Sequence, residues 1–206
     1  LKNGEAYVQS AASMIPAVVM NPSRGDKVLD MCAAPGSKSI NIAQLTGNWA
    51  SIDAWDLYEH KVNLIDHNAR TLGIRCIHAE QHDSTVIDES RKGQYDKVLL
   101  DAPCSGLGVL GHKPEIRWRR TEDNLKEFPP LQQKLLDAVK RALPEVDIVV
   151  ISDYGKGVCN DTVCQQVISA SAGQGKKVII DPKGTNWEKY RSATIITPNL
   201  KELSAV

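Results

Sequence analysis

Short apolar runs that alternate with helical patterns are the feature that most constrains the fold of this 206-residue chain. Apolar residues at helical spacing mark His60–Leu72, Leu131–Leu143 and Thr162–Ala172. The runs expected to form strands are Lys27–Cys32, Ala50–Asp56, Arg75–Ala79, Tyr95–Asp101, Asp147–Ser152, Lys177–Asp181 and Ala193–Thr197. Strands and helices that alternate in this way build β-α-β units. We therefore expect an α/β fold with a mainly parallel sheet of about seven strands.

The composition excludes several classes of protein. Lys and Arg together number 25, as do Asp and Glu, which excludes a uniformly basic nucleic-acid binder. The longest apolar run, Met14–Met20, is far shorter than the roughly 20 residues of a membrane span. An odd number of cysteines without zinc-ligand spacing indicates reduced thiols and no metal site; they are Cys32, Cys76, Cys104, Cys159 and Cys164. With no visible signal peptide and a first residue Leu1, we expect a cytoplasmic fragment.

In parallel sheets, ligands bind at the carboxyl ends of the strands, so the residues just after each strand are informative. The small residues of Ala33–Ser39 allow a ligand to approach the backbone, and the following helix presents N–H groups. Asp56, at the end of the next strand, is placed to accept both hydroxyls of a ribose. A tight turn without a ligand is the alternative interpretation.

Cys104 follows Asp101, Ala102 and Pro103 at the end of the fourth expected strand. A thiolate there can add to C6 of a pyrimidine and make C5 nucleophilic, with a nearby acid bonded to the base. The alternative is a buried structural cysteine, because free cysteines are often core residues.

The only dense basic stretch surrounds one tryptophan in His112–Arg120. Arg and Lys neutralise phosphates, and Trp or Arg stacks on an unpaired base, so this local patch favours RNA as a partner. A solvated loop anchored by its tryptophan is the alternative. The candidate RNA-binding residues are Lys113, Arg117, Trp118, Arg119 and Arg120.

Residues 5 to about 140 resemble the Sun (Fmu) family of S-adenosylmethionine-dependent ribosomal RNA cytosine-C5 methyltransferases. The similarity lies in Ala6–Ser10, in VLDMCAAPGSKS at Val28–Ser39, in YDKVLLDAPCSGLGV at Tyr95–Val109 and in HKPEIRWRR at His112–Arg120. The resemblance implies a three-layer, Rossmann-like methyltransferase fold with S-adenosylmethionine as cofactor. The cofactor-binding residues that it implies are Cys32, Ala33, Ala34, Pro35, Gly36, Ser37, Lys38, Asp56, Asp83 and Asp101.

The resemblance also implies catalytic roles. Lys38 and Asp101 are expected near the target cytosine, and Cys104 matches the cysteine that resolves the enzyme–RNA adduct in the family. The family's usual nucleophile belongs to a Thr-Cys-Ser motif after the fifth strand, where this chain has Ile151–Tyr154. Catalysis would therefore require Cys104 to act as the nucleophile.

From about Pro144 the chain resembles the PfkB/ribokinase superfamily, most closely the heptose-phosphate kinase half of bifunctional heptose kinase/adenylyltransferases. DIVVISDYGKG, DPKGT and TPNLKEL carry this similarity. It implies that Asn199 and Glu202 help to place magnesium and ATP, although the family's catalytic base and sugar-binding part are missing. We therefore expect a composite chain: residues 1–143 methyltransferase-like, and residues 144–206 a ribokinase-like segment that continues the same sheet with its last three strands.

Three functions follow from these patterns. The first is an S-adenosylmethionine-binding, methyltransferase-like domain that acts on ribosomal RNA. The second is an incomplete sugar-kinase segment that binds ATP and magnesium, and the third is an inert composite. The sequence does not determine the oligomeric state.

Overall fold

The computed structural model describes residues 4, 6–9, 11–86, 88–103, 115, 118, 121–142, 148–152, 159–182, 184–198 and 203–204. The chain divides into two compact units, Leu1–Asp101 and Ala102–Val206. The boundary that sequence analysis places after residue 143 is of another kind, because it divides the chain by its two family resemblances and not by compactness. That boundary stays a prediction.

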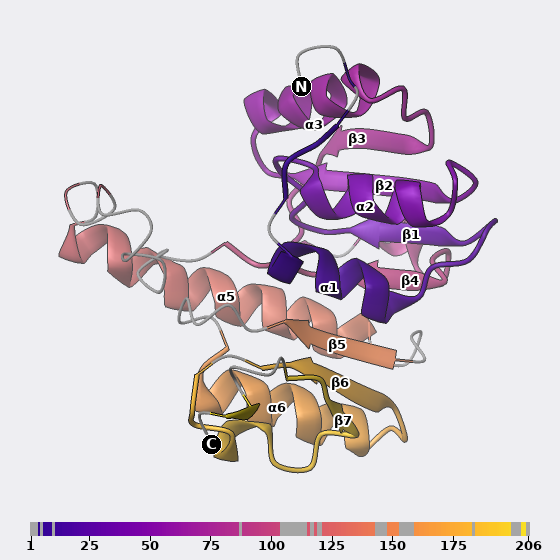
Figure 1. Ribbon diagram of the computed structural model, residues 1–206. Helices are drawn as coiled ribbons and strands as arrows, with labels where there is room; N and C mark the ends of the chain where they lie inside the picture. Colours follow the sequence, from indigo (N-terminus) through magenta and orange to yellow (C-terminus); the bar gives the residue numbers. More distant parts are fainter. Residues whose placement is uncertain are drawn as a thin grey trace. The chain divides into compact units, whose positions relative to one another are not determined.

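The first unit is a parallel sheet, here called sheet 1, with the strand order β3-β2-β1-β4 (Figure 1). Its elements are α1 (Ala11–Met20), β1 (Lys27–Asp30), α2 (Ser37–Leu45), β2 (Ser51–Asp56), α3 (Glu59–Thr71), β3 (Ile77–Gln81), η1 (Glu89–Arg91) and β4 (Lys97–Leu99). Every crossover is long enough for parallel pairing, which a tight hairpin does not allow. The carboxyl ends of the four strands therefore meet at one edge of the sheet.

The core of the first unit lies between sheet 1 and its three helices. Ala17 of α1, Ile40 of α2 and Ala69 of α3 belong to one buried cluster with Val28 and Ile52 of the strands. Because side chains alternate along a strand, Asp53 and Trp55 lie on the opposite face of β2 from Ile52. The helices thus cover one face and fix the position of the strand ends.

The second unit has its own parallel sheet, with the order β5-β6-β7 (Figure 1). Its elements are α5 (Glu122–Ala142), β5 (Ile148–Ser152), α6 (Asp161–Ala172), β6 (Lys177–Asp181), η4 (Glu188–Tyr190) and β7 (Ile195–Ile196). Cys164 and Ile168 of α6 pack with Val178, Ile180 and Tyr190 in a buried cluster. Asn160 caps α6 by accepting a 2.9 Å hydrogen bond from the Val163 N–H.

The parallel α/β architecture is as predicted, and a strand lies within each of the seven expected runs or overlaps it. The single sheet of about seven strands is not confirmed: among the described residues, the ladders form one sheet of four strands and one of three. The physical reason is that β5 pairs with β6 and that α6 buries the apolar side chains of β6, so this segment has a core of its own.

Candidate functional site

The turn from β1 to α2 places main-chain N–H groups at the carboxyl edge of sheet 1. Gly36 has φ +97°, in the left-handed region that favours glycine, and its N–H donates to the Ala33 carbonyl at 2.7 Å. The Ala33 N–H donates to the Trp55 carbonyl at 2.8 Å, which fastens the turn to β2. In the described part of the chain, the N-cap position Gly36 contributes no side-chain hydrogen bond to the first turn of α2. Since the first N–H groups of a helix have no acceptor within it, this turn offers donors to a ligand.

An N-terminal segment contacts the start of α2. The Tyr7 hydroxyl lies 3.1 Å from Ser37 Oγ, and the Gln9 side-chain amide donates to the Ser37 carbonyl at 2.6 Å. Sequence analysis used Tyr7 and Gln9 only as part of a family motif. Their contacts show that residues 6–9 hold the first turn of α2 from outside the sheet.

Asp56 is a buried carboxylate at the end of β2, with 7% of its surface exposed. Its Oδ1 accepts a 3.2 Å hydrogen bond from the Tyr58 N–H and lies 3.5 Å from Lys61 Nζ. Its Oδ2 makes no hydrogen bond or ion pair with any residue that the structure describes. One carboxylate oxygen is therefore available to a hydroxyl donor.

The end of β3 is fastened to β1 through Ser84. The buried Ser84 hydroxyl donates a short, 2.5 Å hydrogen bond to the Met31 carbonyl. Its neighbour Asp83 is exposed, and Oδ1 of Asp83 accepts hydrogen bonds from the N–H and the hydroxyl of Thr85. Asp83 thus lies at the carboxyl edge, as predicted, in a turn that its own side chain closes.

The Lys38 ammonium and an Asp101 carboxylate oxygen are 2.5 Å apart. Lys38 lies in the first turn of α2 and Asp101 follows β4, so the ion pair joins the start of α2 to the end of β4. The Lys38 side chain is 11% exposed, whereas that of Asp101 is 38% exposed. The carboxylate therefore remains accessible to a polar ligand while the lysine holds it in place.

Asp30, which sequence analysis did not select, lies beneath this turn. It is 1% exposed, and burial raises its pKa to about 6, an effect that the Ser39 hydroxyl and the charge of Lys38 partly offset. Burial also raises the pKa of the Cys32 thiol, and the carboxylates of Asp30 and Asp56 add to the effect. Cys32 is therefore a protonated thiol at neutral pH. The one acidic residue in the predicted strand Lys27–Cys32 was the available sequence signal for Asp30.

The predicted cofactor residues thus come together at one edge of sheet 1. Hydrogen bonds and one ion pair link the turn after β1 to β2, to the end of β3 and to Asp101 after β4. The other predicted residues lie outside the described ones: Cys104, Lys113, Arg117, Arg119, Arg120, Asn199 and Glu202. Trp118 is described, and 86% of its surface is exposed.

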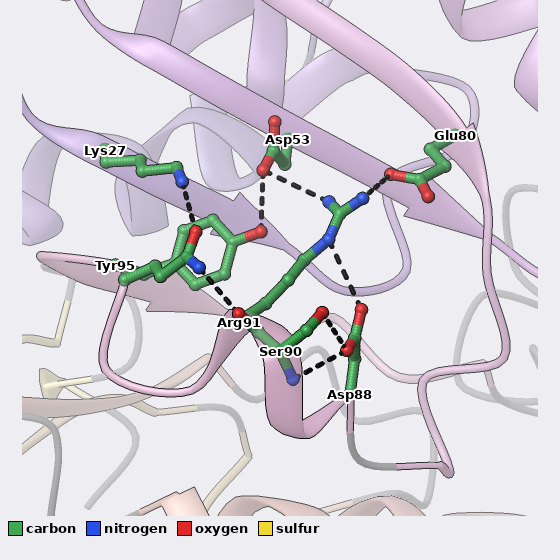
Figure 2. A network of polar contacts seen from close by, with 8 residues as sticks. Lys27, Asp53, Glu80, Asp88, Ser90, Arg91 and Tyr95 are labelled. Atoms are coloured by element: carbon green, nitrogen blue, oxygen red, sulfur yellow. Dashed lines mark hydrogen bonds and ion pairs between the residues drawn. The ribbon is translucent and has the colours of Figure 1, made fainter.

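A polar network that sequence analysis missed lies on the face of sheet 1 opposite the helices (Figure 2). The Arg91 guanidinium is 2.7 Å from Glu80, 3.4 Å from Asp53 and 3.4 Å from Asp88. The Tyr95 hydroxyl donates to Asp53 at 2.6 Å, and burial together with Asp53 raises the pKa of Tyr95 to about 12. This network fastens the connection between β3 and β4 to the sheet, so its role is structural.

The arrangement of metal-ligating side chains and the character of the helices also bear on function. Among the described residues, no three His, Cys, Asp or Glu side chains are grouped so that they could hold a metal ion. None of the helices in the described part of the chain has the length and apolar character required to cross a membrane.

A family model for the 16S rRNA methyltransferases RsmB/F matches residues 17–158. The match continues beyond residue 143 and includes β5, which sequence analysis assigned to the kinase-like segment. The resemblance to the Sun family is therefore confirmed over most of the chain, and it reaches further than the predicted boundary after residue 143.

Relatives and solved structures agree with this match. The probable ribosomal RNA small subunit methyltransferase B of Bacillus subtilis is 40% identical over 136 residues, which are 66% of this chain and 30% of the relative. The Enterobacter ribosomal RNA small subunit methyltransferase B is 33% identical over 138 residues, 67% of this chain and 32% of the relative. NSun6 from Pyrococcus horikoshii, solved with SFG, is 32% identical, with a TM-score of 0.57 over 68% of this chain and 36% of that one. The chain thus spans about a third of the length of these curated relatives.

Proposed function

The chain belongs to the 16S rRNA methyltransferase RsmB/F family, and we propose that it binds S-adenosylmethionine at the carboxyl edge of sheet 1 and acts on RNA. The observation that carries the proposal is the Asp56 carboxylate, which is buried and has one oxygen without a partner among the described residues. Such a carboxylate at the end of β2 suits the two hydroxyls of a ribose.

The residues around Asp56 fit the rest of the cofactor. The N–H groups at the start of α2 are suited to bind the carboxylate of the cofactor. Gly36 has no side chain, so the cofactor can approach the backbone closely there. Cys32, Ala33, Ala34 and Pro35 form the wall of this turn, in which the Ala34–Pro35 peptide bond is cis. Asp83 lies at the neighbouring strand end. S-adenosylmethionine, when bound, supplies an electrophilic methyl group.

For the target base, Asp101 and Lys38 are the candidate orienting residues. The exposed side of the Asp101 carboxylate is suited to the amino group of cytosine, and Lys38 fixes its direction. Cys104 is the candidate nucleophile: its thiolate adds to C6, and C5 then accepts the methyl group. Loss of the C5 proton and departure of the thiolate restore the ring. The raised pKa of the Cys32 thiol argues against Cys32 in this role.

RNA is the proposed macromolecular partner, and the patch that contains Lys113, Arg117, Trp118, Arg119 and Arg120 is the proposed RNA contact. The exposed ring of Trp118 supports a stacking role. The kinase-like alternative, with ATP and magnesium at Asn199 and Glu202, and the inert composite stay predictions.

A thermal-shift experiment on the full chain separates these functions. A ligand that binds only the folded state stabilises it by about 2.7 kcal/mol at 100 times its Kd. We expect S-adenosylhomocysteine to raise Tm and ATP with magnesium to leave it unchanged. The reverse result supports the kinase-like function, and no shift with either ligand supports the inert composite.

Methyl transfer is tested separately with labelled cofactor and cytosine-containing RNA. We expect Cys104→Ser to abolish incorporation of the label and the control Cys159→Ser, at a partly buried cysteine that belongs to neither proposed site, to retain most of it. Equal incorporation by Cys104→Ser and the unmodified chain would eliminate Cys104 as the nucleophile.

A further inference from the structure

Three loops lie side by side at the amino edge of sheet 1, opposite the proposed cofactor site. They precede β1, β2 and β3, which are neighbours in the sheet. The Gly25 N–H donates to the Trp49 carbonyl at 2.8 Å. The Asn48 side chain accepts from the Arg75 N–H at 3.3 Å and donates to the Gly73 carbonyl at 3.4 Å. These bonds make the three loops one continuous surface.

The middle loop of this surface presents an aromatic side chain to solvent. Trp49 is 66% exposed, whereas Trp55, six residues further along the same loop and strand, is 4% exposed. The Arg24 guanidinium carbon lies 5.9 Å from the centroid of the Trp49 ring. An exposed indole beside a guanidinium is a suitable platform for an unpaired base and its phosphate.

The charges of these loops favour an anionic partner. Arg24 and Arg75 are exposed and form no ion pair within the part of the chain that the structure describes. The acidic residue of the three loops, Asp26, accepts a 2.8 Å hydrogen bond from the Ser23 N–H and lies 3.7 Å from Lys97. The surface therefore carries two uncompensated positive charges on either side of Trp49.

We propose that Arg24, Trp49 and Arg75 form a second contact for single-stranded RNA, here called the amino-edge platform. A base stacks on Trp49, and the two arginines bind neighbouring phosphates. The inference rests on the proposed function, since it takes RNA as the substrate. The six residues of β2, at about 3.3 Å each, separate the platform from Asp56 by about 20 Å, so it binds nucleotides away from the target base.

The test measures binding of the full chain to a labelled, cytosine-containing single-stranded RNA by fluorescence anisotropy over a range of salt concentrations. Trp49→Ala is expected to raise Kd at least about 5-fold, the lower end of the effect of losing one stacked base. Trp49→Phe keeps an aromatic ring and is expected to stay within about 3-fold of the unmodified chain. Leu45→Ala removes a neighbouring exposed apolar side chain that cannot stack, and we expect no change.

The arginines have a separate signature. Each phosphate contact to a single strand contributes about 0.7 to the slope of log K against log salt, so Arg24→Gln with Arg75→Gln should lower that slope by about 1.4. Trp49→Ala should leave the slope unchanged. If Trp49→Ala and the double variant bind RNA as the unmodified chain does, the platform serves another partner, such as a protein, and the inference is wrong. If the unmodified chain binds S-adenosylhomocysteine but no RNA, both the inference and the RNA part of the proposed function are wrong.

Discussion

The Ser39 hydroxyl donates a 2.7 Å hydrogen bond to Oδ2 of Asp30, and this bond joins the first turn of α2 to the end of β1. Oδ1 of Asp30 is buried and has no hydrogen-bond partner among the described residues. Burial of this carboxylate is the main cause of its pKa of about 6, compared with an ordinary value of 3.8. The same carboxylate lies close enough to Lys38 for the two charges to interact.

This raised pKa predicts a pH-dependent stability of unusual sign for an aspartate. Because the folded state binds the proton more tightly than the unfolded state, stability falls as pH rises from about 4 to 6 and stays lower above that range. A shift of about 2 units corresponds to roughly 3 kcal/mol. Asp30→Asn cannot ionise and keeps an acceptor for Ser39, so it should gain stability relative to the unmodified chain across this range.

Urea unfolding at several pH values between 4.5 and 7.5 measures this difference, and Asp66→Asn is the control, because Asp66 is an exposed carboxylate on α3. Parallel stability curves for Asp30→Asn and the unmodified chain would show that Asp30 has an ordinary pKa.

The Arg91 network predicts a difference between two arginines (Figure 2). Arg91→Met leaves Asp53, Glu80 and Asp88 without their shared cation, and we expect a loss of about 2 kcal/mol in the free energy of unfolding. This is less than for a fully buried pair, because the Arg91 side chain is 29% exposed. Arg70→Met breaks an exposed pair with Asp66 and should cost under about 0.5 kcal/mol. Equal losses in urea unfolding would contradict the structural role of the network.

Much of the fold follows from local patterns in the sequence. The β6 strand has the predicted bounds, and α3 begins and ends one residue before the prediction, because apolar periodicity records which face of an element is buried. That Asp56, Asp83 and Asp101 lie at the carboxyl ends of strands was predictable for a related reason, and their roles in a site stay predictions. In parallel sheets the strand ends meet at one edge, so the position of a residue along the chain gives its place in the site.

Proline-containing helices were not predictable in the same way. Sequence analysis did not predict α1, which contains Pro16, and the expected helix Leu131–Leu143 omitted the first turns of α5, which contains Pro129 and Pro130. Proline disfavours a helix interior. In α1 tertiary packing outweighs this preference: Pro16 and Ala17 are fully buried, and Asn41 of α2 donates to the Met14 carbonyl. Such packing depends on a distant helix, which local periodicity does not record.

Gly36 and Gly25 form a matched pair for testing the turn after β1. Both have a positive φ, +97° and +90°. Alanine at either position should therefore lower the free energy of unfolding by about 1 kcal/mol. A Cβ at Gly36 would meet Ile65 at ordinary contact distance, and one at Gly25 would meet nothing within 4 Å. Only Gly36 lies at the proposed cofactor turn, so only Gly36→Ala should weaken S-adenosylhomocysteine binding in calorimetry. Similar Kd values for both variants would place the cofactor elsewhere.

The role of Asp56 is tested most sharply with a pair of ligands. If its carboxylate accepts the ribose hydroxyls, Asp56→Asn loses charge-assisted hydrogen bonds, and the Kd of S-adenosylhomocysteine should rise by about tenfold or more. An analogue without the 2′ and 3′ hydroxyls should bind the unmodified chain weakly. Its Kd for Asp56→Asn should be the same as its Kd for the unmodified chain, because the contact that the variant removes is already absent. Asp66→Asn, an exposed aspartate change on α3, controls for the loss of one surface charge. A constant ratio of the two Kd values in Asp56→Asn and the unmodified chain would mean that Asp56 does not contact the ribose, since only a direct contact couples the variant to the hydroxyls.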